Sequence, residues 1–397
     1  MKMRRANSDT PVVLDTRVVC GAGGGPDKTI LNSPRFLSKA GYRMLCAYMH
    51  PPGDTGFDQL RRKAAAWQAP LLAVPDRGPW DWKVVARLLD ICRRERVSIW
   101  HGHDYKSNLL GLVVRRFWPM RLVTTVHGWV HQTRRTPLYY RIDRFCLPRY
   151  ERVLAVSQDL YDQCREAGVP ADQCLLIENG IDCSEFCRRI GTDKAKACQG
   201  LTPGRLVLGA VGRLSAEKGF DLLIRATDQL LKDGFDLELL IVGEGDERQH
   251  LQALVERLGR VDRIRLLGYR TDVRDLFEAM DIYALSSLRE GLPNVVLEAL
   301  AMEVPVVATR VAGVPNLIAD GANGLLTEPG DLAGLTGALA GLLADASLRQ
   351  RLSRTGRMTI ETRYSFAARM DRIRAVYDDL LGRNGTHRAG AVAFSAN

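Results

Sequence analysis

The segment RLVLGAVGRL, residues 205–214, begins a strand–helix–strand pattern. A helical pattern over 218–233 follows it, and the next apolar run is LELLIVGEG, residues 237–245. Later runs of the same kind are IRLLGY (264–269), IYALSS (282–287) and PVVATR (305–310). Strands that alternate with helices of roughly 10–15 residues are typical of parallel sheets with right-handed crossovers. The second half of the chain therefore predicts a doubly wound α/β domain.

The first half shows the same alternation of apolar runs and helical patterns. Its runs include TRVVCGAGGG (16–25), RMLCAYM (43–49), VSIWHGH (97–103), RLVTTVHG (121–128) and RVLAVS (152–157). A chain of 397 residues also exceeds what one hydrophobic core usually supports. We therefore expect an α/β protein with two Rossmann-like doubly wound domains that face each other across a cleft. Ligands in such folds bind at the carboxyl ends of the strands.

The boundary between the two domains is expected in the segment CRRIGTDKAKACQGLTPG (187–204). This segment is polar, contains Gly and Pro, and has no apolar periodicity. We assign residues 1–197 to an N-terminal domain and 198–362 to a C-terminal domain. A last helix is expected at about 363–381, and residues 383–397 lack periodicity, so we expect them to be disordered.

Composition and charge limit the classes of function. With 46% hydrophobic and 26% charged residues and no long apolar run, the chain has the composition of a soluble globular protein. Its first residues, MKMRRANSDTPVVLD, lack the apolar region of a secretion signal, so we expect a cytoplasmic location. Residues 1–200 carry 32 Lys and Arg against 20 Asp and Glu, a balance of +12. No nucleic-acid motif accompanies this charge, so we expect no nucleic-acid partner.

All nine cysteines also lie in the first half of the chain. Their number is odd and they form no CxxC pair, which favours reduced thiols. Cys183, Cys187 and Cys198 have a spacing that fits no familiar zinc site.

Three stretches of the second half carry candidate binding residues. GRLSAEKG (212–219) follows a predicted strand, so Arg213 and Lys218 are expected at its carboxyl end. There they could neutralise a diphosphate, although two solvated basic side chains near a turn would look the same. VGEGDE (242–247) is a turn in which Gly243 and Gly245 would let a ligand approach the backbone, but such turns follow many strands.

The third stretch, EGLPNVVLE (290–298), places two glutamates around a predicted helix start. Pro293 suits the first position of a helix that runs to about Met302. The free amides around Leu292 to Asn294 would form an anion site. Glu290 and Glu298 are hydrogen-bond acceptors, which suits a ligand rich in hydroxyls at both ends. Glutamates on a loop and a helix are usually solvated. Here the apolar helix and the buried strands beside it favour solvation less.

These motifs resemble those of the retaining family 4 glycosyltransferases. EGLPNVVLE is similar to the family's E-x7-E motif, and GRLSAEKG to its phosphate-binding Arg and Lys segment. The resemblance covers nearly the whole chain in the family's order, through GGPDKTI (24–30), HGHDYKSNLLG (101–111), VHG (126–128), AVSQDL (155–160), NGID (179–182), VGEG (242–245) and NGLLTEPGD (323–331).

The resemblance implies a GT-B fold with the nucleotide-sugar bound mainly by the second domain. Glu298 would hold the ribose hydroxyls and Glu290 the hydroxyls of the donor sugar. The backbone of Gly291, Leu292, Pro293 and Asn294 would lie against sugar and phosphate, as that of Gly243 would. Arg213 and Lys218 would stabilise the departing diphosphate.

In the first domain, the resemblance implies that His127 faces the donor sugar. Gly24 and Gly25 would let the backbone approach the phosphates, and the C-terminal helix would pack back on this domain. A histidine after a strand is otherwise more often a structural residue. Asp27 and Asn316 stand where the family often has Glu, and we assign no role to His101 or His103.

The chemistry implied is transfer of a sugar with retention at the anomeric carbon. The leaving diphosphate can accept the proton of the incoming hydroxyl, so no strong base is needed. No Asp-x-Asp metal constellation follows a strand, so we expect no metal and no cofactor besides the nucleotide-sugar substrate. A sugar-nucleotide 2-epimerase and a non-catalytic nucleotide-sugar-binding subunit remain alternatives.

The acceptor is expected to be a glycan or a lipid-linked intermediate of cell-surface polysaccharide synthesis. Residues 106–152 mix Arg with aromatic residues, notably Arg115, Arg116, Phe117 and Trp118 in one run and Arg134, Arg135, Tyr139 and Tyr140 in another. Such a face could rest on an anionic membrane surface, or it could be a solvated helix with aromatic packing beneath.

Overall fold

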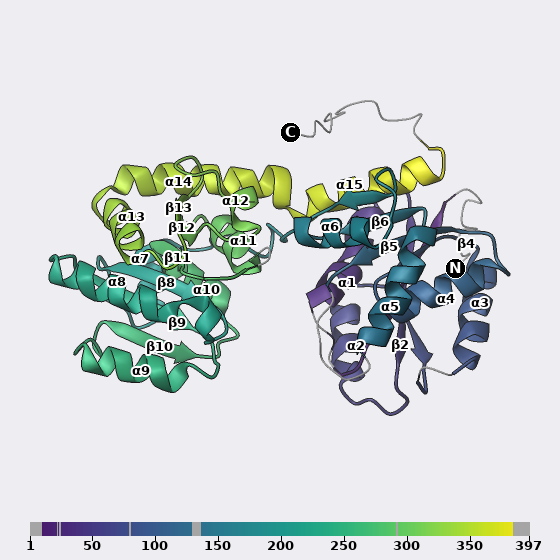
Figure 1. Ribbon diagram of the computed structural model, residues 1–397, viewed down its shortest axis with the longest axis horizontal. Coiled ribbons are helices and arrows are strands. Elements are labelled where there is room, and N and C mark those ends of the chain that lie inside the picture. The colour runs from purple at the N-terminus through teal and green to yellow at the C-terminus, as the bar shows by residue number, and fades with distance from the viewer. Residues whose placement is uncertain are drawn as a thin grey trace, which may run out of the picture. The chain divides into compact units, whose positions relative to one another are not determined.

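The computed structural model describes residues 10–21, 23, 25–78, 81–128, 136–290 and 293–383 (Figure 1). The chain divides into two compact units. Unit 1 comprises Met1–Glu178 with Met370–Asn397, and unit 2 comprises Asn179–Arg369. In the part of the chain that is described, no helix combines the length and apolar composition needed to cross a membrane.

Unit 1 is built on a seven-stranded sheet with the order β3-β2-β1-β4-β5-β6-β7, and all its neighbouring strands pair in parallel. This is the doubly wound order, in which the strand sequence reverses beside β1. The strands are β1 Val12–Val18, β2 Arg43–His50, β3 Leu71–Pro75, β4 Val97–Gly102, β5 Arg121–Val126, β6 Arg152–Ala155 and β7 Cys174–Leu176. The helices are α1 Gly25–Leu37, α2 Phe57–Ala66, α3 Lys83–Glu95, α4 Tyr105–Arg115, α5 Thr136–Cys146, the 3-10 turn η1 Leu147–Arg149, α6 Gln158–Glu166 and the last helix α15 Phe366–Leu380.

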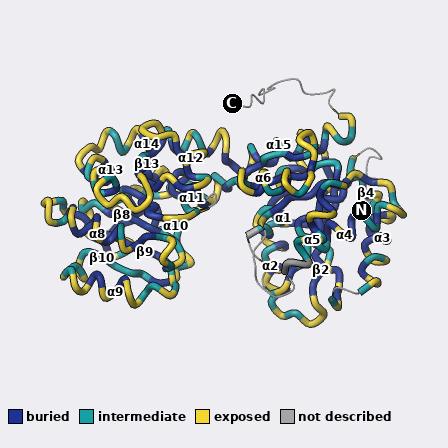
Figure 2. Tube along the Cα trace, in the orientation of Figure 1, coloured by how far each residue is buried: buried dark blue, intermediate teal, exposed yellow. Residues whose placement is uncertain are grey.

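Alternate residues of the unit 1 strands enter two different cores. In β2, Leu45, Ala47 and Met49 join the cluster that α3, α4 and α6 cover, whereas Cys46 and Tyr48 join the one that α1 and α2 cover. Side chains of successive strand residues point to opposite faces, so a sheet covered on both faces needs apolar residues at every position. Figure 2 shows buried residues along the strands of this unit.

Unit 2 is built on a six-stranded parallel sheet with the order β10-β9-β8-β11-β12-β13. The strands are β8 Leu206–Val211, β9 Leu237–Val242, β10 Ile264–Gly268, β11 Ile282–Leu285, β12 Val306–Thr309 and β13 Leu325–Thr327. The helices are α7 Thr192–Cys198, the 3-10 turn η2 Ala216–Lys218, α8 Phe220–Lys232, α9 Arg248–Arg257, α10 Val273–Ala279, α11 Asn294–Ala301, α12 Val314–Leu317, α13 Leu332–Ala344, α14 Ala346–Thr359 and the π-helical turn η3 Ile360–Tyr364.

The unit 2 strands also bury both faces. In β9, Leu239 and Ile241 join the core beneath α8, α9 and α13, while Leu240 and Val242 join the core beneath α10, α11 and α12. The strand LELLIV thus has no polar alternation because neither face meets water. The sheets and the α/β class agree with the sequence prediction.

Three boundaries differ from those expected. The strand β1 is VVLDTRV, Val12–Val18, so it begins before the apolar run that starts at residue 16. The first unit ends at Glu178, ahead of the expected break at 187–204, and α7 packs on α10 within unit 2. The chain returns to unit 1 at Met370, within α15. The expected tail, 383–397, lies outside the described residues except for Arg383.

Candidate active site

An ion pair between Lys218 and Glu290 joins two loops at the carboxyl edge of the unit 2 sheet. Lys218 Nζ lies 2.5 Å from Glu290 Oε1, and the hydroxyl of Ser287 donates to the same oxygen at 2.7 Å. The Lys218 side chain is 21% exposed and that of Glu290 is 9% exposed. The structure therefore brings a cation and a carboxylate together at the position where the sequence predicted a diphosphate and a sugar to bind.

Backbone contacts hold these two loops together. Leu288 N–H donates to the Glu217 carbonyl at 2.8 Å, and the Ser286 hydroxyl donates to the Lys218 carbonyl at 3.0 Å. Gly219 has φ +60°, and a Cβ there would lie 2.3 Å from the Ser286 carbonyl oxygen. A side chain at this glycine would push the loops apart, so the Lys218–Glu290 pair depends on it.

Glu298 lies in α11, and its charge and that of Glu290 both act on Tyr283 of β11. Tyr283 is fully buried and its hydroxyl donates to the Val211 carbonyl at 3.3 Å. Burial raises the pKa of Tyr283, and the charges of Glu290 and Glu298 raise this pKa further. The two carboxylates of the E-x7-E segment thus both act on the electrostatic environment of one buried phenol.

The start of α11 differs by one position from the prediction. The helix begins at Asn294, and Pro293 precedes it as the N-cap residue with φ −76° and ψ 107°. Proline therefore stands just outside the helix, where its missing N–H costs no helical hydrogen bond. Gly291 and Leu292 lie outside the described residues, and their expected contacts with the donor stay a prediction.

Arg213, at the same edge of the sheet, is held by a different carboxylate, that of Glu217. Its guanidinium donates to Glu217 Oε1 at 2.7 Å, and the side chain is 70% exposed. The same contact with Arg213 lowers the pKa of the Glu217 carboxyl. Arg213 is thus held beside Lys218 by a short exposed ion pair that a stronger anion such as a diphosphate could replace.

Close packing against neighbouring backbone requires glycine at positions 243 and 245, which the sequence alone did not show. A Cβ on Gly243 would lie 1.8 Å from the Gly212 carbonyl oxygen, and one on Gly245 would lie 2.2 Å from that of Leu214. The two segments pair through Gly212 N–H to Val242 O and Leu214 N–H to Glu244 O, both at 2.9 Å. Neighbouring backbone explains these glycines, and the donor contact expected at Gly243 stays a prediction.

In unit 1, His127 lies directly after β5 and is half-buried. Its Nε2 lies 3.1 Å from Nδ1 of His103, which follows β4. Nε2 of His103 in turn lies 2.9 Å from Oδ1 of Asp15 in β1. His127, predicted from its motif, is therefore one end of a series that continues into the core.

A third histidine, His101, completes this group. Its Nδ1 lies 2.6 Å from the Tyr377 hydroxyl of α15 and its Nε2 lies 2.8 Å from the Thr125 hydroxyl. Burial raises the pKa of Asp15 to about 6, while the nearby charge of His101 opposes this shift. The ligand atoms of Asp15, His101 and His103 lie within 4.8 Å of one another, but each is already engaged by protein groups.

Sequence reasoning assigned no role to His101 and His103, and Asp15 was not singled out. A signal was present, because HGH at the end of β4 and VHG at the end of β5 are carboxyl ends of adjacent parallel strands. Gly25 begins α1, and Gly24 lies outside the described residues. Asp27 is buried and pairs with Arg17 at 2.8 Å.

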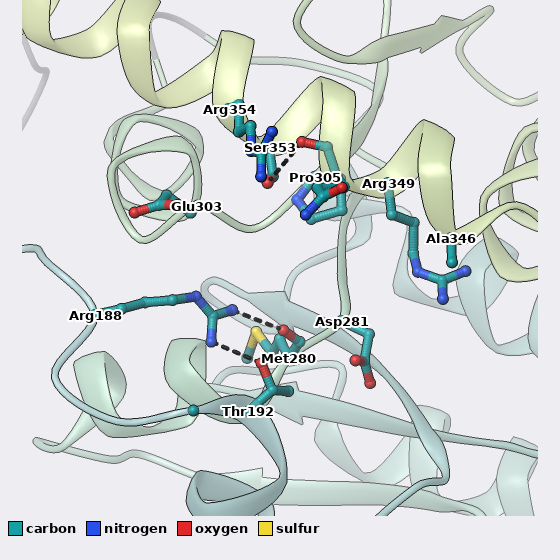
Figure 3. A pocket seen from close by; sticks show the side chains of 12 residues that line it. Arg188, Thr192, Met280, Asp281, Glu303, Pro305, Ala346, Arg349, Ser353 and Arg354 are labelled. Carbon is teal, nitrogen blue, oxygen red and sulfur yellow. Dashed lines mark hydrogen bonds between the residues drawn. The ribbon is translucent and has the colours of Figure 1, made fainter.

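A cavity of about 400 Å³ lies at the opposite edge of the unit 2 sheet, where Met280 and Asp281 precede β11 and Pro305 precedes β12 (Figure 3). Arg188, one of three arginines that line it, donates to the Thr192 hydroxyl at 2.8 Å and to the Met280 carbonyl at 3.4 Å. None of the predicted site residues lines it.

Two family models match the chain and together span most of it. One is described as Glycosyltransferase Family 4 and matches residues 23–185, and the other as Glycosyl transferases group 1 and matches residues 205–345. The chain belongs to the family 4 glycosyltransferases. The resemblance predicted from the E-x7-E and Arg and Lys segments is confirmed.

Named relatives are identical to this glycosyltransferase at about a quarter of the aligned positions. N-acetyl-alpha-D-glucosaminyl L-malate synthase of Bacillus anthracis is 26% identical over 76% of this chain and 80% of its own. UDP-Gal:alpha-D-GlcNAc-diphosphoundecaprenol alpha-1,3-galactosyltransferase of Escherichia coli is 26% identical over 76% of this chain and 80% of its own. The crystal structure of Anabaena HepE in complex with UDP is 21% identical, with a TM-score of 0.76 over 93% of this chain and 100% of the other. This likeness shows the GT-B fold.

We expect Lys218→Ala and Arg213→Ala each to lower kcat for sugar transfer by about a hundred- to a thousandfold. The reason is that removing a preorganised charge aimed at the leaving group commonly costs about 3–4 kcal/mol. Steady-state kinetics with a nucleotide-sugar donor measures the loss. Lys232→Ala is the control, because Lys232 is an exposed lysine at the end of α8 that pairs with Asp228 at 2.8 Å. Near-normal turnover in either site variant would remove that residue from the mechanism.

Proposed function

We propose that this glycosyltransferase moves a sugar, with retention and without a metal, from a nucleoside-diphosphate sugar to a hydroxyl acceptor. The observation that carries the proposal is the Lys218–Glu290 ion pair with Ser287 at the carboxyl edge of the unit 2 sheet. A cation for phosphate and a carboxylate for hydroxyls stand side by side there. A nucleotide-sugar matches both, because it carries its diphosphate on the anomeric carbon and hydroxyls on other carbons of the same sugar ring.

The proposed division of roles follows the positions of the side chains. Lys218 and Arg213 neutralise the diphosphate, each exchanging a carboxylate partner for the phosphate oxygens. Glu290 then accepts hydrogen bonds from the donor sugar, and Glu298, further along α11, from the ribose. His127 of unit 1 contacts the transferred sugar.

The reaction needs no strong base among these residues. The bond between the anomeric carbon and the diphosphate oxygen breaks, and its electron pair stays on the diphosphate. The acceptor oxygen forms the new bond on the same face and passes its proton to the departing diphosphate. Lys218, Arg213 and the amides that begin α11 stabilise the charge that develops there.

The donor is proposed to carry a pyrimidine nucleotide, since the neighbouring HepE structure holds UDP. The acceptor class differs among the relatives, because one is named for L-malate and the other for GlcNAc-diphosphoundecaprenol. We favour a glycan or lipid-linked acceptor and a cytoplasmic protein that docks on the inner face of a membrane.

Unit 1 has an exposed basic and aromatic surface that would serve this docking. Phe117 and Phe145 are 60% and 57% exposed, and the guanidinium of Arg149 lies 3.6 Å from the Phe145 ring centroid. Arg116 beside Phe117 is exposed, and Arg115 links the end of α4 to η1 by donating to the Arg149 carbonyl at 3.3 Å. We call Arg116, Phe117, Phe145 and Arg149 the α4–η1 surface.

Other residues of the predicted membrane face are engaged elsewhere. Arg115 pairs with Glu151 at 2.9 Å, and Trp118 packs on the core with its ring N–H donating to the Val97 carbonyl at 2.8 Å. The Tyr139 ring stacks on Tyr105 with centroids 4.4 Å apart. Arg134 and Arg135 lie outside the described residues.

Substitution of the two glutamates tests the division of roles. Glu298→Gln should weaken binding of a free nucleoside diphosphate and of the nucleotide-sugar alike, because the ribose is common to both. Glu290→Gln should leave binding of the free diphosphate intact and lower turnover. Isothermal titration calorimetry measures the two binding constants. Equal weakening of diphosphate binding by both substitutions would show the assignment to be wrong.

Transfer should continue in the presence of EDTA, because Lys218, Arg213 and the α11 amides supply the positive charge on the leaving group. Product formation with and without chelator is the measurement. Activity lost in EDTA and restored by magnesium or manganese would contradict this. Epimerised nucleotide-sugar formed without acceptor would instead favour the 2-epimerase, and binding without turnover across acceptors a non-catalytic subunit.

Co-sedimentation with liposomes tests the α4–η1 surface. Each cation near an anionic surface contributes about 1 kcal/mol, so binding should rise with anionic lipid and fall with salt. Changing Arg116, Phe117, Phe145 and Arg149 to Ser should abolish it. Changing Arg61, Arg62 and Trp82 to Ser is the control, because it removes the same number of arginines and a ring that is 71% exposed. If the unsubstituted protein does not bind anionic liposomes at low salt, a water-soluble acceptor is favoured.

A further inference from the structure

The cavity of about 400 Å³ in unit 2 lies apart from the donor site. Met280 and Asp281, before β11, and Pro305, before β12, line it at the amino edge of the sheet. Lys218 and Glu290 belong to the loops at the carboxyl edge. Strands rise about 3.3 Å per residue, so the four residues of β11 alone separate the two edges by roughly 13 Å. A ligand in this cavity would therefore occupy a second site.

Three arginines line the cavity from two sides. Figure 3 shows Arg349 and Arg354 on α14 and Arg188 on the segment that precedes α7. Arginine suits phosphate groups because its planar guanidinium donates two parallel hydrogen bonds. The volume also falls within the range of about 300–1,000 Å³ that is typical of small-molecule sites.

Neutral acceptors hold Arg188 in place. Its Nε donates to the Met302 carbonyl at 2.9 Å, and its Nη1 donates to the Thr192 hydroxyl at 2.8 Å and to the Glu278 carbonyl at 2.9 Å. Its Nη2 makes a longer contact, 3.4 Å, with the Met280 carbonyl. The guanidinium is thus fixed in orientation, and Nη2 is the nitrogen best able to turn to a ligand.

The charge of the cavity is only partly compensated. Burial lowers the pKa of Arg188, whereas the charges of Glu303 and Asp281 raise it. Asp281 is already engaged, because its Oδ2 lies 2.7 Å from Nζ of the buried Lys196 and accepts from the Val207 N–H at 2.8 Å. With Asp281 neutralised by Lys196, the three lining arginines face Glu303, which leaves an excess of two positive charges.

The two arginines of α14 keep donors for a ligand. Arg349 uses Nη1 for the Leu342 and Leu343 carbonyls in the last turn of α13. Arginines near a helix end often serve such carbonyls and nothing else. Arg354 is different, because it is exposed and its side chain has no hydrogen bond or ion pair with the residues that the structure describes. Satisfying helix carbonyls therefore does not explain Arg354.

We propose that this cavity binds a small phosphate monoester that also carries hydroxyl groups, such as a sugar phosphate. A phosphate monoester has a charge of about −1.5 to −2 at pH 7, which matches the excess of two positive charges. The hydroxyls of Thr192 and Ser353 and the amide of Gln350 line the same cavity and suit the hydroxyls of the ligand. The Thr192 hydroxyl accepts from Arg188, so its own proton is available to donate.

Isothermal titration calorimetry with ribose 5-phosphate tests the site in the full chain. The titration is run on the parent and on the double variant Arg213→Ala, Lys218→Ala, in which the donor site has lost its two cations. We expect saturable binding in both. Binding that the parent shows and the double variant loses would place the ligand in the donor site. No saturable heat in either protein up to about 10 mM would also overturn the proposal.

Two further titrants test the ligand class. Ribose lacks the phosphate and should give no saturable heat. Inorganic phosphate lacks the hydroxylated part and should bind more weakly than ribose 5-phosphate. Ribose that binds as well as its phosphate, or inorganic phosphate that binds as tightly as the ester, would overturn the assignment to a sugar phosphate.

Substitutions around the cavity should move the Kd for ribose 5-phosphate in opposite directions. Arg354→Ala should weaken binding about tenfold, because it removes a charge-assisted contact from an exposed residue. Glu303→Gln should strengthen binding about two- to fivefold, because it removes the facing carboxylate. A lining residue with only a structural role would not produce a tighter complex. An unchanged or weaker Kd in Glu303→Gln would contradict the charge balance and overturn the proposal.

Arg351→Ala is the matched control. Arg351 is an exposed arginine of the same helix, donates to the Gly321 carbonyl at 3.0 Å and does not line the cavity. Its removal changes the net charge as Arg354→Ala does and should leave the Kd near the parent value. An equal loss of affinity in the two variants would reduce the effect to the general charge of α14 and overturn the proposal.

Discussion

Parallel pairing is the constraint on which both units depend. The neighbouring strands of the two described sheets pair in parallel, so the loops after the strands gather at one edge of each sheet. In unit 2 this edge brings the loop after β8 against the loop after β11, where Gly219 lets the backbone of Ser286 approach. The Lys218–Glu290 ion pair forms only because these loops touch.

That ion pair explains how a polar site can be stable before a ligand arrives. Taking a carboxylate and an ammonium out of water is costly, and each compensates the other at 2.5 Å while Ser287 satisfies a further lone pair of Glu290. A diphosphate and a sugar hydroxyl can replace the two partners without leaving either charge alone. A diphosphate can replace Glu217 as the partner of Arg213 in the same way, and the desolvation cost of this pair is smaller because it is more exposed.

The polar core of unit 1 has a different character. Asp15, His101 and His103 are buried beside strands that are largely apolar, and a helix from the far end of the chain contributes Tyr377 to them. Polar groups in such a place must all find partners, because each one left unsatisfied costs about 1–3 kcal/mol. This need for hydrogen-bond partners links Asp15 in β1, through His103, to His127 after β5.

The sequence by itself determined the two α/β sheets and the segments that carry the family resemblance. These follow from local patterns, namely apolar runs buried on both faces of a sheet and short motifs such as EGLPNVVLE. Only the tertiary structure decided that Lys218 pairs with Glu290, that Gly243 is glycine because of the Gly212 carbonyl, and that His103 joins Asp15 to His127. The sequence separations in these contacts reach 72 for Lys218–Glu290 and 276 for His101–Tyr377. No periodic pattern marks such contacts, because they arise where the crossover order of a sheet places distant strand ends beside one another.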